Sequence, residues 1–501
     1  MNKIYYKSTR SDKEKITSCE AIVKGIAGDG GLYVPSAIPE LDKPFLQLIK
    51  MDYKQLAFFV MNKFLPDFSE EELKLCIERA YDKKFDTQDI APLVKIGDIF
   101  FLELYHGATA SFKDMALSIL PYLLTAAAKK TGIDKEIVIL TATSGDTGKA
   151  ALESFSDVNG TKIIVFYPDK GVSLVQERQM ITQEGSNTFV CAIEGNFDDA
   201  QTQVKNIFAD KVFGKLCAEK KYMFSSANSI NIGRLIPQVT YYINSYTRLL
   251  EMNEIVEGDK INIVVPTGNF GNILAAYYAS GMGLPVNKLI CAANENNVLY
   301  DFFSTGVYNR LRQLKLTISP SMDILISSNL ERLIYDVCDM DSARLERLFK
   351  DLSGTGIFSI DDEMMEKIKD FWSGFATDEQ TVEAIREVYK KYNYLIDTHT
   401  AVGYYVYKQY LNKTGDKTKT IIASTASPFK FPASVVKAVG YKSNFDPENI
   451  NEFELLEKLS KITKVPIPEP LRDIGKKKIL HRNFCRRDKM KDFVAKILNI
   501  Y

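Results

Sequence analysis

The chain has 501 residues, enough for two or three domains with a large buried core. Its 64 Lys and Arg residues balance its 64 Asp and Glu residues, so no net field would gather nucleic acid or an anionic membrane, and a small-molecule partner fits better. The seven scattered cysteines and three dispersed histidines argue against a disulfide framework or a metal site, and they favour a reducing, cytoplasmic compartment.

Residues 1–95 are predicted to form a separate N-terminal domain. Its glycine-rich stretch at 25–35 is interpreted as an ordered loop, because it follows no clear strand and lacks the third glycine of a dinucleotide-binding turn. Helical patterns follow at 52–63 and 69–82. The polar first ten residues contain no apolar run, so we expect no secretory signal.

A loop of small and polar residues at 105–112 leads into an apolar helical segment, with Lys113 at its start. The positive end of the helix dipole and partial burial would both lower the pKa of this amine. A lysine of that kind can act as a nucleophile. Because most lysines are solvated, the pattern alone also allows an ordinary surface residue.

The next apolar run, 137–140, predicts a buried strand that delivers the loop 141–148 into a helix. Hydroxyls, a carboxylate and free N–H groups would gather there to grip a carboxylate or a cofactor oxygen; a plain helix cap is the alternative. The loop superficially resembles the phosphate loop of an ATPase. Thr143 replaces the expected first glycine and Ala150 the expected hydroxyl residue, so that interpretation fails.

A further strand at 163–168 continues an alternation of strands and helices through residue 240, which predicts a mainly parallel sheet. The segment 225–234 then places amides, hydroxyls and an arginine ahead of an apolar helix. Such groups suit an anionic substrate, although helix capping alone could explain the serine and asparagine residues.

The turn 268–272 follows a buried strand at 261–266 and precedes a helix. Gly268 and Gly271 would allow positive φ angles and let successive N–H groups close around a phosphate. The turn has neither a dinucleotide nor a triphosphate signature, which favours a smaller phosphate cofactor. An ordinary turn between strand and helix is the alternative.

A last strand near 421–424 also ends in hydroxyl residues, and one of them could bond a heteroaromatic nitrogen. His399 precedes an aromatic helix and is interpreted as a capping or core residue.

Taken together, the motifs resemble threonine synthases, of the long subfamily found in fungi and many bacteria, within the fold-type II pyridoxal-phosphate enzymes. The ordered set consists of Asp-Gly-Gly-Leu-Tyr-Val-Pro at 29–35, His-Gly-x-Thr-x-x-Phe-Lys-Asp at 106–114, Thr-Ser-Gly-Asp-Thr-Gly at 143–148, Glu-Gly-x-Phe-Asp-Asp at 194–199, Asn-Ser-Ile-Asn at 228–231, Gly-Asn-Phe-Gly-Asn at 268–272, Ser-Asn-Leu-Glu-Arg at 328–332 and Thr-Ala-x-Pro-x-Lys-Phe at 425–431. The set spans nearly the whole chain.

The resemblance implies an α/β fold of two open, mainly parallel twisted sheets flanked by helices, similar to the tryptophan synthase β subunit, with an additional N-terminal domain. It implies a monomer. The expected parts are the N-terminal domain at 1–95, a large cofactor-binding domain at 96–125 and 235–430, a small α/β domain at 126–234, and a C-terminal helical extension at 431–501 that packs on the body.

By the same resemblance, Lys113 would hold pyridoxal phosphate as an aldimine, and Thr425 would face the pyridine nitrogen, where a hydroxyl leaves that nitrogen neutral. The residues expected to cup the phosphate are Gly268, Asn269, Phe270, Gly271 and Asn272. The candidates for holding the substrate's carboxylate and phosphate are Ser144, Asp146, Thr147, Asn231 and Arg234.

The implied substrate is O-phospho-L-homoserine, which would lose its γ-phosphate by elimination and gain water at Cβ to give L-threonine. Ala108, Ser427 and Asn297 depart from the family pattern without removing a cofactor contact. The sequence leaves two alternatives open: a phospho-lyase that releases 2-oxobutyrate and ammonia, and a catalytically silent metabolite-binding relative.

Overall fold

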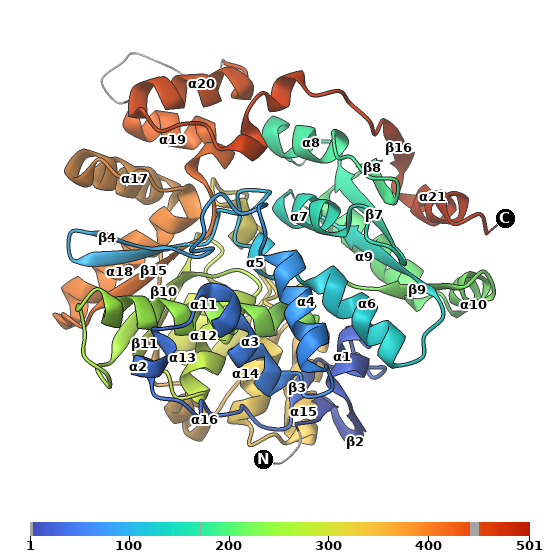
Figure 1. Ribbon diagram of the computed structural model, residues 1–501, viewed down its shortest axis with the longest axis horizontal. Helices are drawn as coiled ribbons and strands as arrows, with labels where there is room; N and C mark the ends of the chain where they lie inside the picture. Colours follow the sequence, from blue (N-terminus) through green and yellow to red (C-terminus); the bar gives the residue numbers. More distant parts are fainter. Residues whose placement is uncertain (1–3, 144, 171, 441–449, 501) are drawn as a thin grey trace.

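Two mainly parallel sheets covered by helices form the body of the molecule, and a small antiparallel sheet of the N-terminal segment is added to them (Figure 1). The computed structural model describes residues 4–143, 145–170, 172–440 and 450–500. The predicted fold class, with two open parallel sheets and an additional N-terminal part, is confirmed.

The large sheet has six strands, of which five are parallel and the edge strand β4 is antiparallel to β5. Its order is β14 (Phe371–Phe375), β11 (Val286–Ala293), β10 (Ile261–Pro266), β15 (Thr420–Ser424), β5 (Ile99–Glu103) and β4 (Leu93–Ile96). Every residue of β10 is buried, as its continuous apolar run predicts for a strand covered on both faces.

Helices cover both faces of the large sheet. The helices that pack on it or on one another are α5 (Asp114–Leu117), α11 (Ile232–Glu251), α12 (Gly271–Gly281), α13 (Val298–Thr305), α14 (Leu330–Val337), α17 (Asp378–Tyr392), α18 (Thr398–Thr414) and α19 (Pro432–Val439). Helix α11 contains Pro237 and is buried along almost its whole length, which places its tyrosines and Arg234 inside the molecule.

The small sheet has five parallel strands. Its order is β16 (Asn483–Arg486), β8 (Thr188–Glu194), β7 (Thr161–Pro168), β6 (Glu136–Ala142) and β9 (Tyr222–Ser225), and its helices are α6 (Leu120–Lys130), α7 (Asp146–Phe155), α8 (Leu174–Ile181), α9 (Phe197–Ala209), α10 (Lys211–Glu219) and α21 (Met490–Ile497). The C-terminal segment thus contributes an edge strand as well as helices. The division of the chain into four parts remains a prediction.

The two helices expected in the N-terminal segment both form, and each starts at a capping box. Its elements are β1 (Tyr6–Ser8), β2 (Ser11–Ile16), α1 (Ser18–Lys24), β3 (Tyr33–Pro35), α2 (Phe45–Leu48), α3 (Tyr53–Phe64) and α4 (Glu70–Ala80). The remaining elements are β12 (Val307–Asn309), α15 (Ser342–Gly354), β13 (Ile357–Ser359), α16 (Asp362–Lys367) and α20 (Glu452–Thr463).

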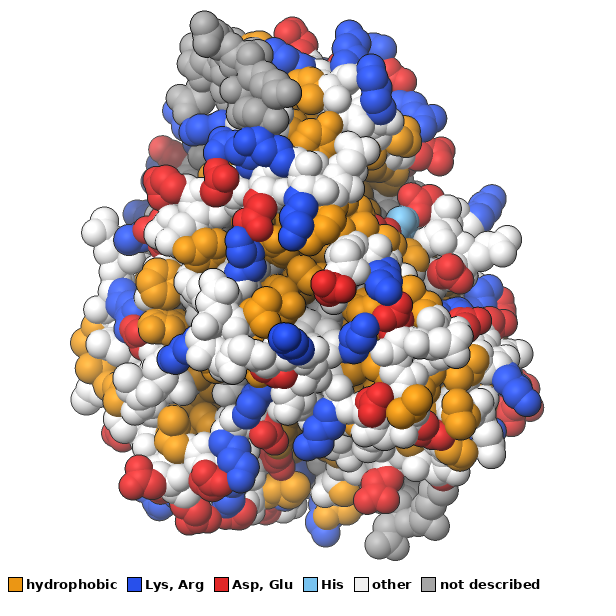
Figure 2. All heavy atoms as spheres, turned by 90° about the vertical axis from the view of Figure 1, so that its left-hand side faces the viewer, with side chains coloured by type: hydrophobic (Ala, Val, Ile, Leu, Met, Phe, Trp, Pro, Cys, Tyr) orange, Lys and Arg blue, Asp and Glu red, His pale blue; other side chains and the backbone are white. Residues whose placement is uncertain are grey.

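Basic and acidic side chains are interspersed on the face shown in Figure 2, as the equal numbers of the two charges lead one to expect. Over the described part of the chain, no helix combines the length and the apolar character needed to cross a membrane.

Candidate active site

Lys113 lies immediately before α5, in a loop that is fixed to the carboxyl end of β15. The N–H of Phe112 donates to the carbonyl of Thr425 at 2.8 Å, and the N–H of Ser427 donates to the carbonyl of Ala110 at 3.0 Å. Two segments that are far apart in the sequence, one with the predicted nucleophile and one with the predicted ring partner, therefore lie side by side.

Lys113 is only 8% exposed. Burial is the main cause that lowers its pKa, to about 8, and the positive charges of Arg234 and Lys430 act in the same direction. Its Nζ atom lies 3.9 Å from the carboxylate of Asp146, which opposes the shift. The amine is still mostly protonated at pH 7, but its neutral, nucleophilic fraction is far larger than that of an ordinary lysine. The predicted direction of the shift is confirmed.

The phosphate turn connects β10 to α12. Its residue with a positive φ is Phe270, at 65°, whereas Gly268 and Gly271 do not have positive φ. Gly268 is required for a different reason: a Cβ atom there would lie 2.6 Å from the carbonyl oxygen of Ser321. The Phe270 ring is buried and stacks on Phe303, with 5.9 Å between ring centroids, so only its backbone is available to a ligand. The expectation of positive φ at the two glycines was wrong.

Neighbouring side chains hold the carbonyl groups of this turn. Ser327 Oγ donates to the Gly268 carbonyl at 2.7 Å, and the backbone N–H and the Nδ2 of Asn329 donate to the Asn269 carbonyl at 3.1 and 2.8 Å. A trans peptide directs its C=O and the following N–H to opposite sides. The N–H groups of Asn269 and Phe270 therefore point away from these partners, as a phosphate cup requires.

Asn272, in the first turn of α12, adds an unpaired donor beside this turn. Its Oδ1 accepts hydrogen bonds from the hydroxyls of Tyr241 and Tyr242, at 2.5 and 2.6 Å. Its Nδ2 is buried and has no partner among the described residues. Because a buried unpaired amide costs roughly 1–3 kcal/mol, this atom is suited to donate to a ligand acceptor.

Ser321 joins the turn to the lysine. Its carbonyl packs against Gly268, and its hydroxyl accepts a hydrogen bond from Lys113 Nζ at 3.5 Å. Its N–H donates to Nε2 of the buried His399 at 3.1 Å, and the other ring nitrogen of His399 lies 3.0 Å from Asp397. His399 is thus a core residue, as interpreted from the sequence, and it fixes the loop that touches both halves of the site.

Asp146 is the first residue of α7 and is buried. Burial opposes its ionisation, but Lys430 and Lys113 outweigh that effect and hold the pKa of Asp146 well below its usual range. Its Oδ1 lies 2.9 Å from Lys430 Nζ and accepts a hydrogen bond from Gln176 Nε2 at 2.9 Å. An ionised carboxylate repels anions, so the side chain of Asp146 is suited to hold the lysines.

Arg234 is a buried cation with no carboxylate partner in the described part of the chain. Burial lowers its pKa to about 10. One Nη donates to the Ala227 carbonyl at 2.9 Å, while its Nε is buried without a partner among the described residues. A guanidinium in this state is suited to pair with a ligand carboxylate or phosphate.

The other predicted substrate residues are less clearly directed at a ligand. Asn231 caps α11: its Oδ1 accepts from Gly233 N–H, and its Nδ2 donates to the carbonyls of Ile22 and Ser226. Thr147 is half-buried in the first turn of α7 and Thr425 is buried after β15. Ser144 lies outside the described residues. Their roles toward a substrate remain predictions.

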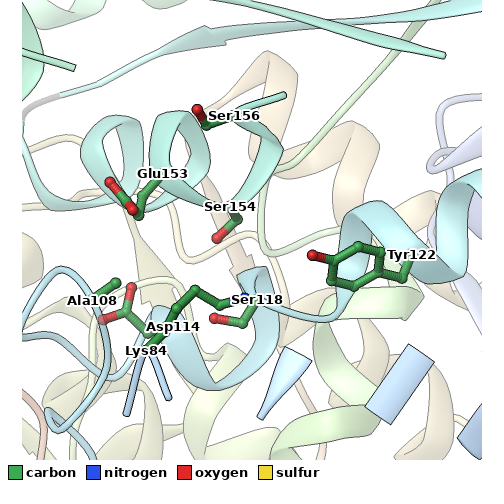
Figure 3. Close-up of a pocket in the computed structure, with 8 residues that line it drawn as sticks. All are labelled: Lys84, Ala108, Asp114, Ser118, Tyr122, Glu153, Ser154 and Ser156. Carbon is green, nitrogen blue, oxygen red and sulfur yellow. The ribbon is translucent and has the colours of Figure 1, made fainter. Parts of the chain in front are cut away.

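A separate polar cavity of about 220 Å³ lies behind the lysine loop, between α5 and the C-terminal half of α7 (Figure 3). Asp114 and Ser118 line one side, and Glu153, Ser154 and Ser156 line the other. None of the phosphate-turn residues lines it, so this space is distinct from the site around Lys113.

Three family models match the chain in order: threonine synthase N terminus at residues 5–81, pyridoxal-phosphate dependent enzyme at 86–358, and threonine synthase C-terminal at 400–473. Threonine synthase of Saccharomyces cerevisiae is 36% identical over 490 residues, covering 92% of this chain and 94% of its own. Threonine synthase-like 1 of Homo sapiens is 39% identical over 437 residues; that match covers 84% of this chain but only 58% of the human protein.

Solved structures agree over the full length. The crystal structure of threonine synthase from yeast has a TM-score of 0.88 at 34% identity, and that of PLP-bound threonine synthase from Brucella melitensis has 0.86 at 32%; each covers 99% of both chains. A buried lysine of lowered pKa and the unpaired amide of Asn272 beside the turn 268–272 fit pyridoxal phosphate, the cofactor named by the family model at 86–358. The chain therefore belongs to the threonine synthase family of pyridoxal-phosphate-dependent enzymes.

Proposed function

We propose that the protein is a threonine synthase, which converts O-phospho-L-homoserine and water to L-threonine and phosphate. The proposal is supported most directly by the contacts of Ser321, which touches both the Lys113 amine and Gly268, so that the proposed nucleophile and the proposed phosphate cup would share one site. Pyridoxal phosphate, when bound there, supplies an electron sink for bond breaking next to the substrate amino group.

Lys113 is proposed to attach the cofactor and, once a substrate amine displaces it, to move protons at Cα and Cβ. A pKa of about 8 suits both tasks, because the amine can donate and accept a proton near neutral pH. Ser321 would orient the amine through its hydroxyl. The neighbouring Asp146 would provide the counter-charge when the lysine carries its proton.

The phosphate turn is proposed to hold the cofactor phosphate through the N–H groups of Asn269 and Phe270 and the Nδ2 of Asn272. Tyr241 and Tyr242 support this role, because they occupy the amide oxygen and leave the amide nitrogen for the ligand. Thr425, whose backbone carbonyl bonds the lysine loop, is proposed to face the ring nitrogen with its hydroxyl.

The substrate is proposed to bring two anionic groups next to these residues. Arg234 is the best-supported partner, because its charge is buried without a counter-ion in the described residues. Backbone N–H groups at the start of α7, with Thr147, would take the other anion. A monomeric state and a cytoplasmic location, both predicted from the sequence, belong to the same proposal.

Product analysis tests the proposal. The purified chain is incubated with pyridoxal phosphate and O-phospho-L-homoserine, and threonine, phosphate, 2-oxobutyrate and ammonia are measured. Threonine with equimolar phosphate is the expected result. Phosphate with equimolar 2-oxobutyrate and ammonia would identify a phospho-lyase, and the absence of any turnover would leave a metabolite-binding relative.

A further inference from the structure

Lys430 is a fully buried lysine next to the active site, with an exposed fraction of 0%. Its ammonium group contacts three acceptors: Asp146 Oδ1 at 2.9 Å, the Thr109 carbonyl at 3.0 Å and Gln179 Oε1 at 3.3 Å. An ammonium has three N–H donors, so all of them are used within the protein. Lys430 therefore has no donor left for a substrate and can act only through its partners.

These partners come from different parts of the fold. Thr109 belongs to the loop that leads into Lys113, whereas Asp146 and Gln179 belong to α7 and α8 beside the small sheet. Lys430 itself follows β15 of the large sheet, a few residues after Thr425. One ammonium group thus ties the two sheets together at the position of the reactive lysine.

The Asp146 carboxylate is shared between two lysines. It contacts Lys430 at 2.9 Å through Oδ1, and its Oδ2 lies 3.9 Å from Lys113, beyond hydrogen-bond distance. The other charged groups that face Lys113 are Arg234 on α11 and Asp114 on α5. Because the closer bond goes to Lys430, Asp146 gives Lys113 only part of the stabilisation that a direct ion pair would provide.

We propose that Lys430 is a positioning residue that holds the Asp146 carboxylate back from full pairing with Lys113 and thereby keeps the Lys113 amine reactive. This inference rests on the proposed function, because a neutral Lys113 amine matters only if that lysine attaches the cofactor and moves protons. It assigns the lysine of the 425–431 motif a task that differs from ligand binding. The repulsion between the two ammonium groups acts in the same direction.

The substitution Lys430→Met tests the proposal because it keeps an unbranched side chain only one heavy atom shorter and removes its charge. Asp146 would then turn fully to Lys113, and the midpoint of Lys113 titration is expected to rise by about one pH unit. The full chain, stripped of cofactor, is treated with an amine-reactive acylating reagent across a pH series, and mass spectrometry gives the labelling of Lys113. The pH dependence of pyridoxal phosphate attachment gives a second readout.

Lys149→Met is the matched control. Lys149 is also a buried lysine, and it pairs with Glu153 at 2.8 Å and with Gln183, but it makes no recorded contact with Lys113. It is expected to lower thermal stability and to leave the Lys113 midpoint unchanged. Lys430→Arg retains the charge and is expected to keep the midpoint close to that of the wild type.

Asp146→Asn extends the test in the opposite direction, since removing the carboxylate should lower the Lys113 midpoint. If Lys430→Met fails to fold, Asp146→Asn and Lys430→Arg decide the matter. An unchanged midpoint in Lys430→Met, an equal shift in Lys149→Met, or an unchanged midpoint in Asp146→Asn would each overturn the proposal. Failure of the proposed function would instead appear as wild-type protein that attaches no cofactor at Lys113.

Discussion

The two halves of the site are held in different ways. The phosphate turn is fixed by neutral hydrogen bonds from Ser327, Asn329 and the two tyrosines on Asn272. The lysine half depends on buried charges, with Asp146 shared between two lysines. Neutral bonds do not titrate near neutral pH, whereas a balance of buried charges does. The protein groups that hold the cofactor phosphate should therefore keep their charge state across neutral pH, whereas the reactivity of the lysine should depend on pH.

The largest expected effect comes from removing the lysine itself. In Lys113→Ala the cofactor can no longer be attached, so we expect the yellow absorbance of the lysine-bound form to disappear and turnover to fall by at least about 10³-fold. The phosphate turn should remain intact, because none of its supporting bonds involves Lys113. Absorbance spectra, product analysis and circular dichroism measure the three outcomes. An unchanged spectrum in a folded variant would contradict the assignment of Lys113 as the residue that attaches the cofactor.

The substitution Gly268→Ala should weaken the phosphate half of the site. Its Cβ would lie 2.6 Å from the Ser321 carbonyl, a backbone atom that cannot rotate away. Overpacking of this kind costs roughly 1–3 kcal/mol, so we expect pyridoxal phosphate affinity to fall about 10- to 100-fold. Titration of the cofactor-free protein with pyridoxal phosphate, followed by fluorescence, measures this affinity.

Gly271→Ala serves as the matched control for Gly268→Ala. The nearest atoms to a Cβ at Gly271 lie at 3.5 Å, which is ordinary contact, and φ is not positive there. It should bind the cofactor as the wild type does. Equal losses in the two variants would show that the Ser321 contact does not shape the turn.

The difference between the halves also explains what the sequence could predict. The strand, turn and helix around 268–272 and the position of Lys113 follow from local periodicity and glycine placement, and both were found. The positive φ of Phe270 was missed, and the bonds that hold the carbonyls just before it come from Ser327 and Asn329, which are distant in sequence. Local patterns contain no information on such partners.

The charged half was only partly predictable for the same reason. Ser321 lies 208 residues from Lys113, and Lys430 lies 251 residues from Gln179, so no spacing rule connects them. The only available signal was that Lys430 belongs to the 425–431 motif. Edge strand β16 was missed because four residues are too few to establish an alternating pattern. Buried charge networks and short edge strands depend on the tertiary fold.

The buried charge of Lys113 should also lower the stability of the cofactor-free protein. The folded-state pKa of Lys113 is lowered from 10.5 to about 8, so at pH 7 its ammonium costs the cofactor-free fold roughly 3 kcal/mol. Between these two values the unfolded chain binds more protons than the folded one. The penalty from the Lys113 ammonium is therefore present in full below pH 8, and it shrinks as the pH rises from 8 toward 10.5. Stability rises with pH across that window.

Lys113→Met should remove this penalty. The cofactor-free variant is expected to melt a few degrees above the wild type at pH 7, and the gain should shrink as the pH approaches 10. Thermal melts of both proteins at several pH values measure the difference. A gain that is the same at every pH would mean that packing, and not charge, sets the stability of this half.

The smallest expected effect tests the claim that the phosphate half is neutral. Tyr242→Phe removes one of the two hydroxyls that hold Asn272 Oδ1, while Tyr241 remains. Loss of one hydrogen bond costs about 0.5–1.5 kcal/mol, so cofactor affinity should fall about 2- to 10-fold. Tyr246→Phe, whose hydroxyl bonds Asp259 and Gly258 at the other end of α11, should leave affinity unchanged.

The pH dependence of that loss decides the comparison between the two halves. Because neither the Tyr242 hydroxyl nor the Asn272 amide titrates near neutral pH, the affinity of Tyr242→Phe should fall by the same factor at pH 6.5 and pH 8.5. The Lys113 titration midpoint should stay where it is in the wild type, in contrast to its shift in Lys430→Met. A moved midpoint in Tyr242→Phe would mean that the hydrogen bonds of the turn and the charges around the lysine form one coupled network, and that the two halves of the site cannot be tuned separately.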